Sequence, residues 1–369
     1  MTRKPLLALE IGSTKVACLL GQPSASSASW LSGSSAPAYD LLGGALAAYE
    51  TDDPGWPGDP AILAAAISRA LDDPSLAHRP DRAVVALSHP ALAHRRVSAC
   101  IDLADQPIPV RSRDLQRLKA QAISQALGVD REALLCEPLG YDGNGFEGVG
   151  DPRGLPATRL SASFQLVTVP LAVRRAVFQA LEMAGLELER MVYTVKALAE
   201  ARLESETAQP AEMSPRILLV DVGGACTDLA VADRGTLLRT HTLAWGGKHL
   251  GSKPDGRAFS EAQLATLQAG LHEILRDLAQ PERVIVTGRG ALVDGLVEWI
   301  ERTTALPSVL GRSPRAQSLG DLARQIAFSP LIGVLAMSFQ GSSAPEGARP
   351  ARAVDRLLER TKRLLIDYF

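Results

Sequence analysis

The stretch from Leu6 to Leu20 reads LLALEIGSTKVACLL, and a second stretch from Ile217 to Val231 reads ILLVDVGGACTDLAV. The two superpose without a gap. In each, an apolar run of strand length ends in a carboxylate, Glu10 or Asp221, and an apolar residue and a glycine follow. Because a second apolar run comes directly after the turn, we predict two related β-hairpins.

The chemistry of these turns favours an anion site. Glycines let main-chain amides approach a phosphate closely, and a carboxylate at a strand end is suited to a hydrated Mg²⁺. Either hairpin alone is typical of an ordinary tight turn, but two facing copies would hold the phosphates of one nucleotide. The candidate nucleotide contacts are Gly12, Ser13, Thr14, Lys15, Gly223, Gly224, Ala225, Cys226 and Thr227, and the candidate Mg²⁺ ligands, acting through water, are Glu10 and Asp221.

A third segment supports the same interpretation. Residues Val284 to Ile300, VIVTGRGALVDGLVEWI, are expected to form a buried strand, a glycine-rich turn and a helix, which suits a phosphate or a ribose. By itself the segment would be an ordinary connection between a strand and a helix. Its candidate contacts are Gly288, Arg289 and Gly290.

Composition excludes several classes of protein. The chain has 369 residues, 46% of them hydrophobic and 22% charged, with a formal net charge of −2, which is typical of a globular protein and predicts no nucleic-acid partner. Its four cysteines form no CxxC pair, which favours a reducing compartment over a disulfide framework or a zinc site. No run approaches 18 uninterrupted apolar residues, so we expect neither export nor a membrane span. HExxH and GxSxG motifs are also missing, and the sequence identifies no catalytic residue.

Taken in order, the three segments resemble the phosphate 1, phosphate 2 and adenosine motifs of the actin, Hsp70 and sugar-kinase superfamily. Within it, the chain resembles the FtsA family of bacterial cell-division proteins. Residues 141–143, 151–155 and 159–160 are similar to the inserted subdomain 1C of FtsA, and the resemblance covers most of Leu6 to Met337. It implies an α/β, actin-like, two-lobed fold of duplicated ribonuclease-H-like halves, with a 1C-type insert and a C-terminal amphipathic helix.

The resemblance also implies a domain organisation. In the family, a subdomain called 2B is inserted in the second lobe, but here one polar turn and one helix that begins after Ser260 separate Gly247 from Val284. We therefore predict that 2B is reduced or absent. The expected units are a first lobe, 1A, at 1–88 plus 169–200, a 1C-like subdomain at 89–168, a second lobe, 2A, at 201–338, a flexible linker at 339–351 and a membrane-targeting helix at 352–369.

Departures from the family motifs weaken the expected chemistry. Glu10 stands where the family usually has Asp, and the second loop reads GGACTD instead of GGGTTD. We expect ATP and Mg²⁺ binding to be weak or lost, with Cys226 serving as packing. In the family, 2B also receives the C-terminal peptide of FtsZ, so its loss leaves open whether FtsZ or another division protein is the partner.

The C-terminal tail predicts contact with a membrane. An apolar face flanked by basic residues is typical of a helix that lies among anionic lipid headgroups, although such a helix can also dock on its own globular body. One helix of this kind binds reversibly, so stable attachment implies self-association. The candidate membrane residues are Leu357, Leu358, Arg360, Lys362, Arg363, Leu364, Leu365, Tyr368 and Phe369.

These observations give one leading hypothesis and two alternatives. The first is a peripheral protein on the cytoplasmic side of the bacterial inner membrane, which tethers or recruits divisome proteins at the septum, forms filaments and is at most a weak ATPase, not a metabolic enzyme. The second is a small-molecule kinase of the same superfamily, in which Glu10 and Asp221 would hold Mg²⁺, although no base motif is found. The third is a scaffold like PilM of pilus assembly, which shares the hairpins and the 1C-like insert; the basic tail argues against it.

Overall fold

We analysed a computed structural model, which describes residues 5–24, 39–49, 56–76, 80–201, 203, 216–250, 259–276 and 280–340. The predicted membrane helix at 352–369 and most of the predicted linker lie outside the described residues. The last described helix continues to Gln340 and so includes the first two residues of the predicted linker, 339 and 340.

Two five-stranded sheets share one topology. The first has the order β11-β4-β1-β2-β3 and the second the order β14-β13-β12-β15-β16. In each sheet the first three strands in the chain form an antiparallel meander and the other two run parallel to the first. The duplication therefore extends from the two hairpins to whole sheets. The strands are β1 (Leu6–Ile11), β2 (Lys15–Pro23), β3 (Tyr39–Ala48), β4 (Arg82–Leu87), β11 (Glu187–Tyr193), β12 (Ile217–Val222), β13 (Thr227–Asp233), β14 (Thr236–Leu243), β15 (Arg283–Thr287) and β16 (Ser308–Leu310).

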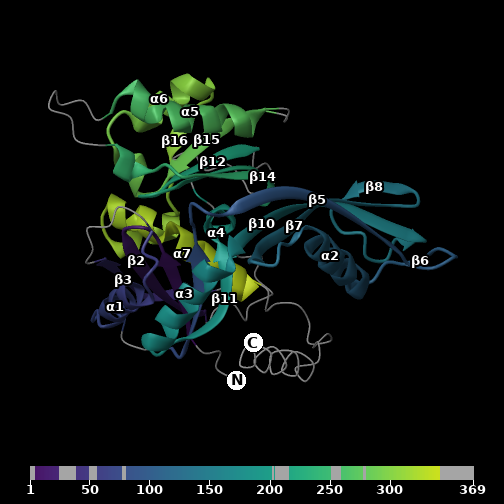
Figure 1. The fold of residues 1–369 in the computed structure, drawn as a ribbon, viewed down its shortest axis with the longest axis horizontal. Helices are drawn as coiled ribbons and strands as arrows, with labels where there is room; N and C mark the ends of the chain where they lie inside the picture. The colour runs from purple at the N-terminus through teal and green to yellow at the C-terminus, as the bar shows by residue number, and fades with distance from the viewer. Residues whose placement is uncertain are drawn as a thin grey trace.

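Helices cover both faces of these sheets, which explains why the central strands are apolar along their whole length. On the first sheet, α1 (Pro60–Leu71) and α3 (Leu171–Met183) pack on one face, and α7 (Leu322–Gln340) packs on the other. On the second, α5 (Glu261–Leu275) and α6 (Leu296–Thr304) pack on one face, and the short helix α4 (Thr194–Glu200) lies between the opposite face and α7. In Figure 1 the two lobes lie one above the other.

The position of α7 corrects the predicted boundary of the second lobe, which included residues up to 338. Phe328 is fully buried in one cluster with Ala8 and Ala17 of the first sheet, and a Cβ at Gly44 would lie 3.0 Å from its ring. Small residues on the strands thus receive the large side chains of the helix. By length and apolarity α7 would suffice to cross a membrane, but 67% of its 322–339 window is buried inside the protein, as expected of a core helix.

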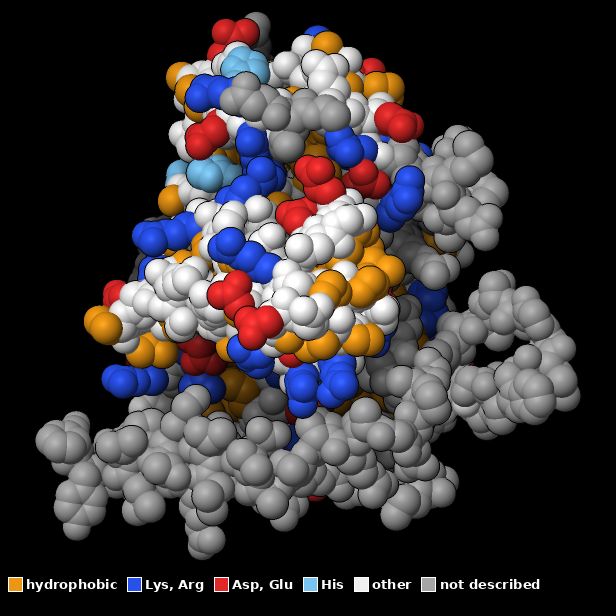
Figure 2. All heavy atoms as spheres, turned by 90° about the vertical axis from the view of Figure 1, so that its right-hand side faces the viewer, with side chains coloured by type: hydrophobic (Ala, Val, Ile, Leu, Met, Phe, Trp, Pro, Cys, Tyr) orange, Lys and Arg blue, Asp and Glu red, His pale blue; other side chains and the backbone are white. Residues whose placement is uncertain are grey.

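The third unit is inserted between β4 and α3 and projects to one side of the first lobe (Figure 1). Helix α2 (Ser112–Ala126) packs on one face of its sheet, around Leu118 and Phe164. Basic and acidic side chains are interspersed where this side of the molecule is seen in Figure 2. The sheet has the order β5-β10-β7-β8, made of β5 (Ala93–Asp102), β10 (Arg159–Pro170), β7 (Arg131–Gly143) and β8 (Phe146–Val149), with a small ribbon of β6 (Ile108–Pro109) and β9 (Pro156–Ala157) beside it.

Candidate nucleotide cleft

The two hairpin turns face each other across a cleft between the lobes. Both turns close with the same main-chain hydrogen bond: the Gly12 amide donates to the Lys15 carbonyl at 3.1 Å, and the Gly223 amide to the Cys226 carbonyl at 3.0 Å. Equivalent positions of the repeat therefore have equivalent backbone geometry.

Most of the predicted site residues meet in this cleft. Ala225 does not line it, but its amide is bonded to the opposite loop; Thr227 is fully buried, and Gly290 packs against Val222. Their role in binding a nucleotide stays a prediction. The predicted residues that do line the cleft are Glu10, Gly12, Ser13, Thr14, Lys15, Asp221, Gly223, Gly224, Cys226, Gly288 and Arg289.

The third turn needs glycine for a steric reason. Gly288 has φ = 80°, and a Cβ there would lie 2.5 Å from Oδ1 of Asp221. The chain then forms a 3₁₀ turn, η4 (Arg289–Leu292), and α6 begins only at Leu296. The predicted strand, glycine-rich turn and helix are therefore all present, with the 3₁₀ turn between the glycine turn and the helix.

The prediction missed five lining residues: Ser88, Thr287, Ile326, Ala327 and Pro330. Ser88 follows β4, Thr287 ends β15, and the other three belong to α7. No local motif marks Ser88 or the α7 residues, because the topology of the first lobe brings them to the cleft.

An ion pair on the first hairpin engages one of the two candidate metal ligands. Nζ of Lys15 lies 3.2 Å from Oε2 of Glu10, and both side chains are largely buried. Across the cleft, burial raises the pKa of Asp221 well above its usual value, and the charges of Glu10 and Asp228 add to this shift while Lys15 opposes it. Burial that disfavours the charged carboxylate also disfavours Mg²⁺ binding, since the metal prefers charged oxygens.

A buried carboxylate on β13 joins the two lobes. Asp228 is fully buried and accepts hydrogen bonds from the hydroxyls of Ser88, Tyr193 and Thr242. Burial raises its pKa, and the three hydroxyl bonds oppose that shift. Because Ser88 and Tyr193 belong to the first lobe, this carboxylate fixes the second hairpin against it.

Cys226 lies next to the same group. Its side chain is 5% exposed, its Sγ lies 3.3 Å from Oγ of Ser88, and burial raises its pKa. A thiol with a raised pKa is a poor nucleophile, which agrees with a packing role.

Mg-ATP does not fit the cleft in this conformation. The cavity volume is about 60 Å³, whereas ligand pockets usually measure roughly 300–1,000 Å³. Oγ of Ser13 already accepts a hydrogen bond from the Ala225 amide, at 2.9 Å. Among the described residues, no group of three His, Cys, Asp or Glu side chains is placed to hold a metal ion.

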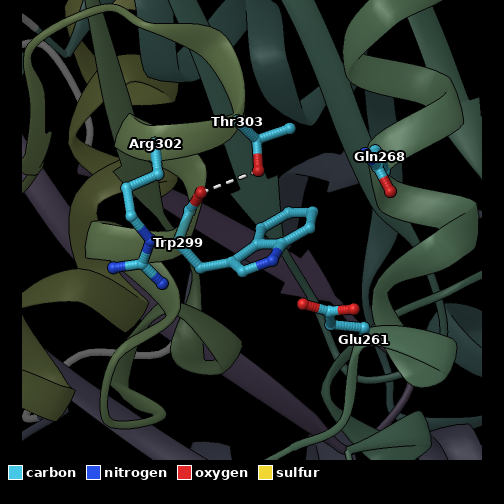
Figure 3. A pocket seen from close by; sticks show the side chains of 5 residues that line it. All are labelled: Glu261, Gln268, Trp299, Arg302 and Thr303. Atoms are coloured by element: carbon cyan, nitrogen blue, oxygen red, sulfur yellow. Dashed lines mark hydrogen bonds between the residues drawn. The ribbon is translucent and has the colours of Figure 1, made fainter.

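A second hollow, of about 430 Å³, lies on the second lobe between α5 and α6 (Figure 3). The indole of Trp299 projects between Arg302 on one side and Glu261 on the other, and Gln268 lies across from it on α5. None of these side chains is among the predicted nucleotide contacts, and none lines the cleft, so the hollow is separate from it.

Two repeated sheets, facing hairpins and a cleft between the lobes define an actin-like α/β fold, the class of protein predicted from the sequence. The family model described as the SHS2 domain inserted in FtsA matches residues 91–168. The FtsA protein of Agrobacterium fabrum is 26% identical over 66% of this chain, and this match spans about half (54%) of that relative. The FtsA protein of Pseudomonas aeruginosa is 23% identical over 96% of both chains.

Among solved structures, the chain is similar to the PilM-PilN type IV pilus biogenesis complex. The TM-score is 0.62 at 17% identity, over 92% of this chain and 99% of that one, which shows a shared fold. Together with the FtsA relatives and the inserted domain, this fold shows that the chain is an FtsA-like actin-fold protein. The predicted fold class and the resemblance to FtsA are confirmed.

Proposed function

We propose that this chain is a cell-division scaffold that works on the cytoplasmic side of the bacterial inner membrane. The observation that supports this role most strongly is the subdomain at 91–168, because the family model that matches it describes a domain inserted in FtsA. Relatives named as the cell division protein FtsA support the same role.

The structure suggests a revised division of the chain into units. We assign 1–88, 169–193 and α7 to the first lobe, 89–168 to the 1C-like subdomain, and 216–310 to the second lobe, with α4 between the two lobes. Only residues 244–260 separate β14 from α5, a segment too short for a subdomain of its own. A scaffold without 2B would have to bind FtsZ or another divisome protein through a different surface.

Membrane attachment is assigned to residues 352–369. Each basic residue near an anionic surface contributes about 1 kcal/mol, so five basic side chains beside a leucine-rich face bind reversibly. Several copies held together by self-association bind much more firmly, because their effective concentration at the membrane is high. Filament formation would provide those copies.

ATP has a minor role in this proposal. Actin-like folds generally bind ATP with Mg²⁺, and the residues that would hold the phosphates here are those of the two hairpin turns and of the Gly288 turn. The small cleft and the burial of Asp221, which disfavours its charged form, favour weak or absent binding. They also argue against the kinase alternative, which requires room for a nucleotide and a second substrate.

A PilM-like role in pilus assembly is the second candidate, since the likeness to the PilM-PilN structure covers most of both chains. A fluorescent fusion at native expression level separates the two roles. We expect a band at the division site that appears before constriction. Exclusion of the fusion from that site would contradict the cell-division role.

Vesicle sedimentation tests the membrane contact. The intact chain should pellet with vesicles that contain phosphatidylglycerol, and a chain that ends at Gln340, where α7 ends, should stay in the supernatant. Lys362→Glu with Arg363→Glu should also abolish pelleting. The matched control is Lys119→Glu with Arg175→Glu, which reverses two exposed charges on α2 and α3 and should leave pelleting intact. Equal pelleting of the intact and shortened chains would refute the tether.

A further inference from the structure

The loops of the two lobes touch each other directly at the cleft. Oγ of Ser13 accepts a hydrogen bond from the Ala225 amide at 2.9 Å, and Nζ of Lys248 donates to the Ser13 carbonyl at 3.2 Å. Gly224 permits this approach, because a Cβ there would lie 2.6 Å from Cγ2 of Thr14 and 2.7 Å from Oγ of Ser13. The first loop thus occupies the space in front of the second.

A second connection lies deeper between the lobes. Ser88 and Tyr193, from the ends of two strands of the first sheet, both donate to the carboxylate of Asp228 on the second sheet. Tyr193 and Asp228 are fully buried and Ser88 is partly buried, and a buried polar group without a partner is costly. Separation of the lobes would therefore expose or orphan all three.

The inserted subdomain supplies a third connection. His94 of β5 bonds through Nδ1 to the Thr240 hydroxyl at 2.7 Å and through Nε2 to the Thr242 hydroxyl at 2.8 Å, both on β14 of the second lobe. Glu137 of β7 accepts from the Leu237 amide on the same strand, at 2.9 Å. The edge strand β14 is thus held by a unit that belongs covalently to the first lobe.

We infer that the chain's own side chains hold the two lobes closed across the cleft, so that closure requires no nucleotide. Contacts at three separate places leave little freedom for a hinge, and a protein that lacks a second populated state has nothing for a ligand to shift. The inference goes beyond the proposed function and does not depend on it, because the contacts are the same whether the scaffold serves division or pilus assembly.

Hydrogen exchange of the full-length chain tests this closure. In the nucleotide-free wild type, the Ala225 amide should be protected, and 5 mM Mg-ATP should not slow its exchange further. Ser13→Ala removes the acceptor and should speed exchange over residues 223–226 by about fivefold, the factor that one net hydrogen bond supplies. The control is Ser98→Ala, which removes an exposed hydroxyl bond to Ser163 in the inserted subdomain and should leave 223–226 unchanged.

Two further variants keep the test decisive. Ser13→Thr retains the hydroxyl and should restore protection, which a general packing defect at this position would not do. Lys248→Gln breaks the other contact between the loops from an exposed position and should also speed exchange over 12–15, even where Ser13→Ala folds poorly. Wild-type exchange as fast as in Ser13→Ala, or protection that appears only with Mg-ATP, would overturn the inference.

Discussion

The two hairpin turns of the repeat have equivalent backbone geometry but present different side chains to the cleft. In the first, Ser13 and Lys15 project toward the cleft; in the second, the equivalent positions are Gly224 and Cys226, which are smaller. Here the side chains of one loop fill the space that the other leaves, so the pair is complementary, as in a protein interface.

The strands behind the turns differ in a second way. Ala17 on β2 and Asp228 on β13 are equivalent in the repeat and both fully buried, but only Asp228 is polar. The first hairpin is therefore held by apolar packing alone at this position, and the second by hydrogen bonds that reach the opposite lobe.

The largest expected change in stability comes from removing this difference between Ala17 and Asp228. Asp228→Ala, which gives the second hairpin the residue of the first, should lower the free energy of unfolding by about 3 kcal/mol, because one buried and two partly buried hydroxyls lose their acceptor. Asp228→Asn keeps an acceptor oxygen and should cost clearly less. Urea denaturation measures both, with Asp102→Ala at an exposed position as the control. A loss for Asp228→Ala no greater than for that control would mean that the network contributes nothing.

A smaller loss of stability is expected when a larger side chain is placed in the second loop, at Gly224. Gly224→Val places side-chain atoms against Ser13 and Thr14 and should destabilise the protein by about 2 kcal/mol. Gly150→Val, where a Cβ meets nothing within 4 Å, is the matched control in thermal unfolding. The double variant Ser13→Gly with Gly224→Ser, which swaps the residues of the two loops, should be more stable than Gly224→Ser alone. Equal stability of the two would show that the loops do not pack as a complementary pair.

The polar network of the second hairpin also predicts a dependence on pH. Burial, with the nearby charges of His241 and Arg131, lowers the pKa of His94 to about 3. Since the unfolded chain then binds more protons than the folded one, His94 contributes full stability above about pH 6.5 and loses it as the pH falls toward 3. Wild-type stability should decline more steeply than that of His94→Gln between pH 6 and 4, by at most about 1.4 kcal/mol per pH unit.

Comparison with the variant isolates His94 from the other buried groups. The raised pKa values of Asp221 and Asp228 act with the opposite sign, but they are common to both proteins and cancel in the difference. Parallel slopes in urea titrations of the two proteins would contradict the prediction.

The features predicted correctly from the sequence are those that a local pattern of residues encodes. Both hairpins, with Glu10 and Asp221 facing one cleft, followed from a repeat that can be read along the chain. The placement of α7 did not, because chain order put it after the second lobe, whereas its large side chains fit the small residues of the first sheet. Ser88 was missed for a related reason: its partner Asp228 lies 140 residues away, and only the topology brings them together.

Local sequence patterns also could not predict whether the cleft is open or filled by the protein's own side chains. Lys15 was predicted to contact a nucleotide, but the structure pairs it with Glu10 in the same hairpin. A ligand site and an ion pair use the same residue types at the same spacing. The contact between Ser13 and Ala225, which decides between an open and a filled cleft, depends on the relative position of two sheets.

The distance between the lobes tests this account most directly. Spin labels at Met183→Cys on α3 and Glu298→Cys on α6, both exposed, would report it in a Cys100→Ser background, since the other three cysteines are buried. We expect pulsed electron paramagnetic resonance to give one narrow distribution of distances between the two labels, unchanged by Mg-ATP. A broad distribution without nucleotide that narrows and shifts when Mg-ATP is added would show a working hinge and contradict the closed cleft.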